Sequence, residues 1–507
     1  MTKKLLKFCA ISLFALASCT KEDTTTTEAS ISIPESQKTA LSAVEVKSKV
    51  LEQVNQNKQF NWGSTSDYMV WSALQNGNNV CTIGFGNSKT DFDRSKSSNH
   101  VYLQNQLLSL ISKFEGKPIA KILINADPYL NLIDVIIEKQ ETVIALRRLG
   151  YVRYVEPSDF RMTDDGANEN KNVTTDAIAS SSGCGLESEA VNALDYTIVT
   201  PNAKAPWAFY KHNIPSAWSY SSGKGIGLGV VDSGASTVNS LLNASFNNGL
   251  STGRTVQKYG VYVDSIWPWS TGTDGVNDLC GHGTSMASVA TAPRNDKGQP
   301  VGVAYNANLV TYRAASNVVL DGYHEQNGVK NAFTALGNNA NVKIISMSMG
   351  HIISVGKIED GVRYAYSKGK LIFCAAGTST SFTTFAGVIF PAWMAETVAV
   401  TGIKEASTYQ ACDVCHTGGK VDFTIMMERA SGNHIPVNSY YDAQGDYVGG
   451  SSVATATTAG IAALVWAKNP TWTRDQVLAK MRQTSHLYPN KHAEYGYGMP
   501  NALLAVQ

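Results

Sequence analysis

The chain has 507 residues, of which 43% are hydrophobic and 9% aromatic, enough for two or three ordinary cores, and this excludes an intrinsically disordered protein. Its 42 Lys and Arg residues nearly cancel its 41 Asp and Glu residues, which excludes the strongly basic surface typical of a nucleic-acid binder. We therefore expect no nucleic-acid partner and instead a neutral one, a peptide or a small molecule.

The N-terminal residues have the pattern of an export signal. Lysines at positions 3, 4 and 7 precede an apolar run that is too short to span a bilayer, and small residues follow it. The sequence Leu-Ala-Ser-Cys that ends at Cys19 resembles the lipobox of bacterial lipoproteins, in which the cysteine is acylated. We expect residues 1–19 to be a lipoprotein signal, and Cys19 to anchor the protein in a bacterial cell envelope, at the outer membrane or cell surface. A plain secretory signal that is cut elsewhere is the alternative.

The next three segments predict a tether, a small domain and a linker. Residues 20–60 begin with a stretch rich in Thr, Ser and charge, which predicts a flexible tether. Residues 61–160 carry a β-α-β-β-α-β order, which predicts a small α+β domain with a ferredoxin-like sandwich. Residues 161–204 are polar and rich in Gly, Ser and Asn, so they predict an exposed linker that is open to proteolytic nicking.

Residues 205–507 alternate short apolar strands with helices. This pattern predicts an α/β domain in which a parallel sheet is covered by helices on both faces. Ligands of such sheets bind at the carboxyl ends of the strands. The expected strands lie at 225–233, 308–315, 343–350, 370–377, 397–403 and 421–425, and the expected helices at 284–291, 325–337 and 356–368.

Three polar residues stand at element ends in this domain. Asp232 ends an apolar strand, His282 lies between two glycines at the start of a helix, and Ser451 and Ser452 precede a helix of small apolar residues. Each alone is typical of a turn, a loop or a helix cap. Together, in the order Asp, His, Ser, they are the parts of a nucleophilic triad.

These segments resemble the motifs of the subtilisin-like (subtilase) serine peptidases. The resemblance covers roughly residues 205–507 and rests on six motifs that occur in order: "VVDSGA", "GHGTSMASVAT", "SMSMG", "AAG", "GSSVATA" and "YGYGMPNALLAV". It implies a serine endopeptidase that acts on peptides or proteins through an acyl-enzyme. No cofactor is required for that chemistry; structural calcium is common in the family, but no ligands for it can be named here.

The resemblance also implies roles for individual residues. Asp232, His282 and Ser452 would form the catalytic triad, with Ser451 at the position where the family has threonine. The Ser452 backbone N–H and Thr378 would face the oxyanion. The substrate-binding segments would be Ser348, Met349, Gly350, Ala375, Ala376 and Gly377.

Two positions depart from the family pattern. Ala456 replaces the proline that ends the serine motif, a change that suits a helix interior. Thr378 stands where the family has an asparagine that donates to the oxyanion, and its hydroxyl lies closer to the backbone on a stiff side chain. A peptide-binding pseudopeptidase of the same fold is therefore the alternative function.

The small N-terminal domain has a matching interpretation. Its end, "YVRYVEPSD", resembles the last strand of the family's inhibitory propeptide. We therefore expect residues 61–160 to be a pro-domain and the chain to be cut between about 157 and 205, with an unrelated accessory domain as the alternative.

The segment "CDVCH", Cys412 to His416, matches the pattern of c-type haem attachment. A local disulfide between Cys412 and Cys415, a zinc or unpaired pair, and a haem site all remain open from the sequence, and the last would make the chain a haem or redox protein.

Overall fold

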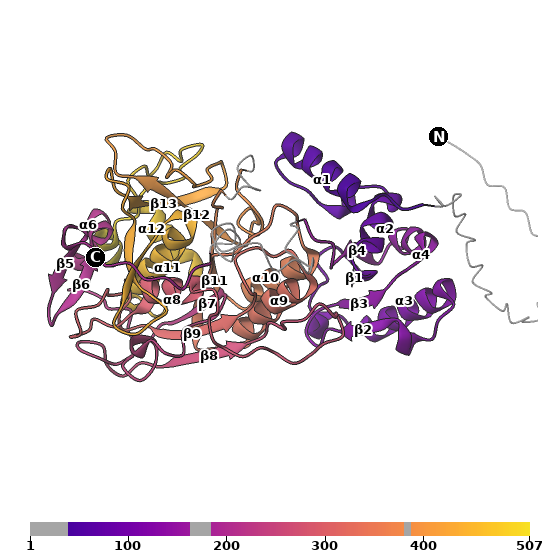
Figure 1. Cartoon of the computed structure of the whole chain (residues 1–507), viewed down its shortest axis with the longest axis horizontal. Coiled ribbons are helices and arrows are strands. Elements are labelled where there is room, and N and C mark those ends of the chain that lie inside the picture. Colours follow the sequence, from indigo (N-terminus) through magenta and orange to yellow (C-terminus); the bar gives the residue numbers. More distant parts are fainter. Residues whose placement is uncertain (1–38, 163–183, 380–386) are drawn as a thin grey trace, which may run out of the picture. The chain divides into compact units, whose positions relative to one another are not determined.

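The computed structural model describes residues 39–162, 184–379 and 387–507 (Figure 1). The expected signal, Cys19 and the first part of the tether lie outside these residues, as does the part of the linker over 163–183.

The N-terminal domain is a four-stranded antiparallel sheet covered by helices. Its strands lie in the order β2-β3-β1-β4, which is the order of a ferredoxin-like sandwich. The elements are β1 (Val80–Phe85), α3 (His100–Glu115), β2 (Leu123–Ala126), β3 (Leu132–Ile136), α4 (Gln140–Arg147) and β4 (Val152–Pro157). The β-α-β-β-α-β prediction is therefore confirmed.

The expected tether over 20–60 is wrong for its second half. Residues Ala43–Asn57 form helix α1, which begins with a capping box between Ser42 and Glu45, and Asp67–Gln75 form helix α2. Val46, Val50 and Val54 are fully buried on one face of α1, because a spacing of four residues places side chains above one another on a helix. These three valines dock α1 onto the domain core, so the ordered chain begins before residue 61.

The large domain contains a seven-stranded sheet in the order β13-β12-β11-β10-β7-β9-β8, and every pair is parallel. Helices α9 (Tyr323–Asn338) and α10 (Gly356–Ser367) pack on one face of the sheet, and α8 (His282–Thr291) and α11 (Gly450–Lys468) pack on the other (Figure 1). The α/β prediction is confirmed; β8 was not among the expected strands. The strands are β7 (Gly227–Asp232), β8 (Val256–Gly260), β9 (Asn308–Arg313), β10 (Val342–Met347), β11 (Leu371–Ala375), β12 (Val398–Lys404) and β13 (Val421–Glu428).

The longer helices of this domain are α8 (His282–Thr291), α9 (Tyr323–Asn338), α10 (Gly356–Ser367), α11 (Gly450–Lys468) and α12 (Arg474–Gln483). Shorter elements are the hairpins β5 (Tyr196–Val199) with β6 (Ala203–Pro206) and β14 (Ile435–Asn438) with β15 (Gly445–Val448), and helices α6 (Trp207–Lys211), α7 (Ile214–Ala217) and α13 (Ala502–Val506).

Helix α11 runs through the middle of the core. Its side chains are small or apolar and almost all buried, which lets the helix lie close to β10, β11 and β12. Among the described residues it is the one helix long and apolar enough to cross a membrane by length and composition alone. Because 89% of that apolar window is buried inside the protein, core packing accounts for its composition.

The second half of the expected linker is also structured. Cys184 forms a disulfide with Cys280, and residues 196–206 form the β5–β6 hairpin. Asp195 is 1% exposed and pairs with Arg429. The exposed-linker prediction is therefore wrong from residue 184 onward, because a covalent bond and a buried ion pair fix this segment to the large domain.

Buried charges join the N-terminal domain to helices α9 and α10. The Lys357 ammonium donates to Asp134 at 2.9 Å, and both side chains are fully buried. Further cross-domain contacts are the buried pair of Lys330 with Asp127, the two-pronged bond of Arg153 to Asp360 at 2.6 and 2.7 Å, and the bond from the Gly356 N–H to Glu156 at 2.7 Å.

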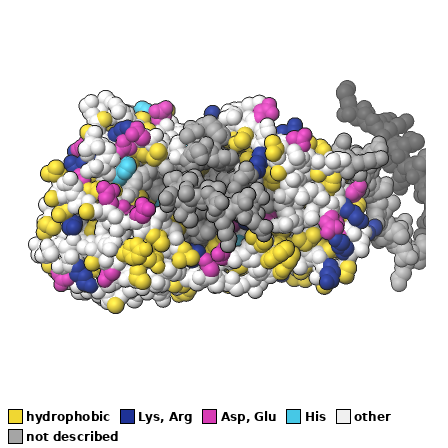
Figure 2. All heavy atoms as spheres, viewed as in Figure 1, with side chains coloured by type: hydrophobic (Ala, Val, Ile, Leu, Met, Phe, Trp, Pro, Cys, Tyr) yellow, Lys and Arg dark blue, Asp and Glu magenta, His cyan; other side chains and the backbone are white. Residues whose placement is uncertain are grey.

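The surface mixes both signs of charge. On the face drawn in Figure 2, the Lys and Arg side chains are interspersed with Asp and Glu side chains, and the described residues show no broad area of one sign. This matches the near-balanced composition of the chain.

Candidate functional site

Asp232 ends strand β7 at the carboxyl edge of the sheet and is fully buried. Its Oδ1 accepts one hydrogen bond from the Ser233 N–H at 2.8 Å and another from His282 Nδ1 at 2.8 Å. Because Nδ1 faces a carboxylate, it carries the ring proton of a neutral imidazole, which leaves Nε2 as the acceptor. The two residues that the sequence singled out separately are therefore a hydrogen-bonded pair.

His282 is the first residue of α8 and lies between glycines with different tasks. Gly281 has φ +85°, a conformation that favours glycine. At Gly283, a Cβ atom would lie 2.3 Å from the Gly234 carbonyl oxygen, so only glycine lets α8 approach the end of β7.

The pKa of His282 reflects opposing effects. Burial disfavours the imidazolium, but the charge of Asp232 and its hydrogen bond to the ring outweigh burial, and Asp278 adds in the same direction. The pKa of His282 is therefore raised above its ordinary value of 6.5. A base at this position gains its proton at a higher pH than a free histidine would.

The adjacent serines at the start of α11 have different surroundings. Ser451 is fully buried, and its Oγ accepts from the Gly377 N–H at 3.1 Å. Ser452 is partly exposed, and its Oγ donates a long bond of 3.5 Å to the Ser348 carbonyl. Among the described residues, the Ser452 hydroxyl bonds to Ser348 and not to His282. Hydrogen bonds of catalytic groups are commonly long or misaligned without substrate.

Thr378 lies against the first turn of α11. Its Oγ1 accepts from the Ser451 N–H at 3.2 Å and shares a hydrogen bond of 3.0 Å with Ser451 Oγ. A Cβ atom at Gly450 would lie 2.7 Å from Thr378 Oγ1, so the side chain is packed directly over the helix start. The short threonine therefore contacts the helix end. Its role towards an oxyanion stays a prediction.

The expected substrate-binding segments flank these residues. Ser348 contacts Ser452 in both directions, since its Oγ donates to the Ser452 carbonyl at 3.1 Å. The Gly350 N–H donates to Val318 at 3.0 Å, and the Gly350 carbonyl accepts from Leu320 at 3.3 Å. A substrate strand that pairs with Gly350 would have to displace the segment 318–320.

The remaining residues of those segments face the interior. Met349 is 2% exposed, and Ala375 and Ala376 are buried at the end of β11. Gly377 has φ +127°, and a Cβ atom there would lie 2.4 Å from His416 Nδ1. Substrate contacts of these four residues stay a prediction.

The "CDVCH" segment supports the loop that carries Thr378. Cys412 and Cys415 form a disulfide, as one of the three interpretations predicted, and the bond leaves neither sulfur as a thiol for haem or zinc. The His416 ring contacts the Gly387 carbonyl at 2.9 Å through Nδ1 and Ser379 Oγ at 3.2 Å through Nε2, and the His416 N–H donates to Gly377.

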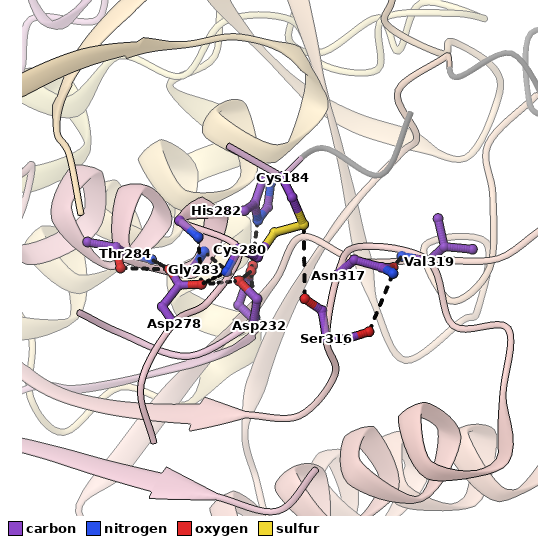
Figure 3. The surroundings of a disulfide bond; sticks show 12 residues. Cys184, Asp232, Asp278, Cys280, His282, Gly283, Thr284, Ser316, Asn317 and Val319 are labelled. Carbon is purple, nitrogen blue, oxygen red and sulfur yellow. Dashed lines mark hydrogen bonds and ion pairs between the residues drawn. A yellow bond between two sulfur atoms is a disulfide. The ribbon is translucent and has the colours of Figure 1, made fainter. Parts of the chain in front are cut away.

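Two features of the site were not found from the sequence. The first is the disulfide between Cys184 and Cys280, whose Cys184 sulfur lies 4.0 Å from the Ser316 carbonyl (Figure 3). The second is Asp278, a fully buried carboxylate that accepts the N–H groups of Cys280 and Gly281. An Asp a few residues before a helix start is a signal for such a turn, and "DLCGHG" carries it.

The described part of the chain contains no metal-binding centre. No group of three or more His, Cys, Asp or Glu side chains is arranged there to hold a metal ion. Structural calcium therefore remains a prediction without ligands.

The comparisons with known proteins agree with the motifs. The sequence model of the subtilase family matches residues 223–498, which is more than half of the chain. The chain belongs to the subtilase family. It is a serine endopeptidase by this membership and by its similarity to subtilisins.

Similar proteins include several that are named as subtilisins. A subtilisin of Bacillus sp. (strain TA39) is 26% identical over 65% of this chain and 77% of its own length. Subtilisin E of Bacillus subtilis is 30% identical over 46% of this chain and 58% of its own length. The crystal structure of fervidolysin from Fervidobacterium pennivorans, a keratinolytic enzyme related to subtilisin, has a TM-score of 0.58 over 85% of this chain and 61% of its own, at 17% identity. That likeness shows the fold.

The variants Thr378→Asn and Thr378→Val distinguish two roles that position 378 can have in this subtilase. One is donation to the oxyanion, and the other is capping of the start of α11. An asparagine amide reaches further than the threonine hydroxyl, so we expect Thr378→Asn to raise kcat at least about tenfold with little change in KM, since one oxyanion donor is worth on the order of 10²–10³ in kcat. Thr378→Val keeps the shape but loses the bond to the Ser451 N–H, so we expect a lower melting temperature.

Steady-state kinetics and thermal unfolding measure both effects, and Thr378→Ser, which keeps the hydroxyl, is the control. A change confined to KM in both variants would place Thr378 in the substrate cleft but away from the oxyanion.

Proposed function

We propose that this subtilase hydrolyses peptide bonds through Asp232, His282 and Ser452 and an acyl-enzyme. The observation that carries the proposal is the buried hydrogen bond from His282 Nδ1 to Asp232, which leaves Nε2 free to act as a base. The partial exposure of Ser452 beside the burial of Ser451 supports Ser452 as the nucleophile.

The steps follow from the chemistry of these groups. His282 Nε2 takes the Ser452 hydroxyl proton as Oγ attacks the carbonyl carbon, and the bond electrons move onto the carbonyl oxygen. The Ser452 N–H in the first turn of α11 and the positive partial charge of this helix end stabilise that oxygen. His282 then gives the proton to the leaving amine, and water, activated by the same base, releases the acyl group. Asp232 stabilises the imidazolium throughout.

A peptide-binding pseudopeptidase is the second candidate. The observation that favours it is the contact of Thr378 with Ser451, which engages the hydroxyl that would otherwise face an oxyanion.

Replacing each serine tests the nucleophile. We expect Ser452→Ala to lower kcat by on the order of 10⁶, because the Ser452 hydroxyl is the group that attacks the carbonyl carbon and becomes acylated. Ser451→Ala loses the bond from the Gly377 N–H and should keep most of the activity. Turnover of a peptide library and labelling by a fluorophosphonate probe measure the difference. Equal losses from both changes would contradict the assignment, and a wild-type chain that neither reacts nor turns over would favour the pseudopeptidase.

The N-terminal domain is, in this proposal, a pro-domain that is cut away by the enzyme between about 157 and 205. Its last strand, β4, reaches the large domain through Arg153, Tyr154 and Glu156, and Asp360 on α10 accepts from the first two.

The wild type and Ser452→Ala also test whether the enzyme cuts its own chain. Intact-mass spectrometry should find the cut chain in the wild type and only the uncut chain in Ser452→Ala.

Glu156 should make the docking of the pro-domain depend on pH. Burial, together with the charges of Glu359 and Asp360, raises the pKa of Glu156 from 4.5 to about 8, although the Gly356 N–H and Lys357 oppose the shift. A raised pKa means that the docked state prefers the protonated carboxyl, so docking is strongest below about 4.5 and weakens as the pH rises through about 8.

Size-exclusion chromatography of the cut protein between pH 6 and 9 measures this release. Glu156→Gln keeps an acceptor for the Gly356 N–H without a titrating group, so its complex should persist at pH 9. Glu138→Gln, at a carboxylate that is 45% exposed and pairs with Lys117 of the same domain, is the control and should behave as the wild type. Equal release of wild type and Glu156→Gln at every pH would contradict the role of Glu156.

Membrane attachment through an acylated Cys19 completes the proposal and places the enzyme in the cell envelope. Helix α11 is apolar enough to span a membrane but is buried in the core, so the lipid would be the anchor. We expect Cys19→Ser to move the protein from the membrane pellet to the supernatant after a carbonate wash. A variant that still pellets would rule out the lipid anchor.

A further inference from the structure

Asp278 holds the turn that presents His282. Its Oδ1 accepts from the Cys280 N–H at 3.0 Å and the Gly281 N–H at 2.8 Å, and its Oδ2 accepts from the Thr284 N–H at 2.7 Å. The Thr284 hydroxyl adds a fourth bond at 2.6 Å, which again ends on Oδ2. A buried carboxylate is costly unless its lone pairs are filled, and here donors on both sides of His282 fill them (Figure 3).

These bonds supply the cap that α8 otherwise lacks. Gly281 stands at the N-cap position and has no side chain with which to accept an N–H of the first turn. Asp278 accepts the Thr284 N–H instead, and its negative charge lies at the positive end of the helix. The first residue of that helix is His282, so the cap fixes the backbone from which the imidazole projects.

Ser233 links this carboxylate to the one that pairs with His282. Its Oγ lies 2.8 Å from Asp278 Oδ1 and 3.3 Å from Asp232 Oδ1, so its single proton goes mainly to Asp278. The same Oγ accepts from the Gly283 N–H at 3.0 Å. The end of β7 and the start of α8 are therefore bound to each other through Ser233 as well as through Asp232.

We infer that Asp278 is a positioning residue for catalysis, which orients His282 and stabilises its imidazolium through the cap of α8 and through Ser233. This inference rests on the proposed function of His282 as the base. The charged groups near His282 are Asp232 and Asp278; Arg313 donates to the Ser233 carbonyl and is itself paired with Asp274.

The variant Asp278→Asn tests both the orientation of His282 and the stabilisation of its imidazolium. The amide cannot accept at its nitrogen and carries no charge, so we expect kcat to fall about tenfold to a hundredfold, with KM changed less than about twofold, as a small misplacement of a catalytic group costs on that order. Loss of the charge also lowers the pKa of His282, so the acid limb of the kcat/KM profile should move to lower pH. Asp422→Asn, which removes a buried carboxylate paired with Arg482, is the control for general destabilisation and should move neither kcat nor that limb.

An NMR titration of the His282 ring, assigned with His282→Gln, reads the same pKa without turnover. It therefore separates this inference from the proposed function, since a chain that hydrolyses nothing still gives a titration. Two results together would overturn the role of Asp278. They are a His282 pKa that is equal in Asp278→Asn and the wild type, and a loss of activity in Asp278→Asn no larger than that in Asp422→Asn.

Thr284 gives a second, milder test if Asp278→Asn does not fold. Thr284→Ser keeps the hydroxyl that donates to Asp278 and should retain wild-type kcat. Thr284→Val removes this hydroxyl and should lower kcat severalfold. The charge of Asp278 is still present in both variants, so the pKa of His282 should not change. Wild-type kcat in Thr284→Val would overturn the role of the cap.

Discussion

The hydrogen bond between His282 Nδ1 and Asp232 Oδ1 is the contact on which the rest of the site depends. It joins the end of β7 to the start of α8, two elements brought together only by the fold, and it sets the tautomer of the ring. This bond requires the start of α8 to lie so close to the end of β7 that a Cβ atom at position 283 would clash with the Gly234 carbonyl. Burial disfavours the imidazolium, but the charge of Asp232 and its hydrogen bond to the ring outweigh that effect, so the pKa of His282 is raised.

The sequence predicted the elements whose pattern is periodic and local. Apolar runs between helices were enough to predict the parallel sheet. Ser452 was chosen over Ser451 as the expected nucleophile through the resemblance to the subtilase serine motif, and that choice stays a prediction. The sequence could not predict the disulfide of Cys184 with Cys280, because several cysteines allow many pairings. Asp278 was missed for a related reason: its importance lies in four donors that a tight turn gathers around it. Helix α1 was missed because Thr and Ser before it dominated the composition and hid three valines at helical spacing.

The interface between the N-terminal domain and the large domain combines buried ion pairs with apolar contacts. Lys357 with Asp134, and Arg153 with Asp360, contribute little net stability, because the cost of desolvation offsets most of their attraction. They do fix one geometry, since a shifted docking would leave a charge buried and unpaired. Apolar contacts accompany the ion pairs: Ile352 and Ile353 of the large domain pack into the N-terminal core, and Leu130 and Leu132 pack against Tyr364 of α10.

The two helices that carry the proposed nucleophile and base lack a side-chain cap of their own and receive one from elsewhere, but the two caps differ in charge. Asp278, an anion, holds the start of α8, where a cation forms when His282 takes its proton. Thr378, a neutral hydroxyl, holds the start of α11, where the proposed mechanism places an anion. A carboxylate at position 378 would satisfy the Ser451 N–H equally well but would repel the developing oxyanion and neutralise the helix end that stabilises it. The charge of each cap thus follows from the charge that develops beside it, and this complementarity explains why helices that start alike are capped by different residue types.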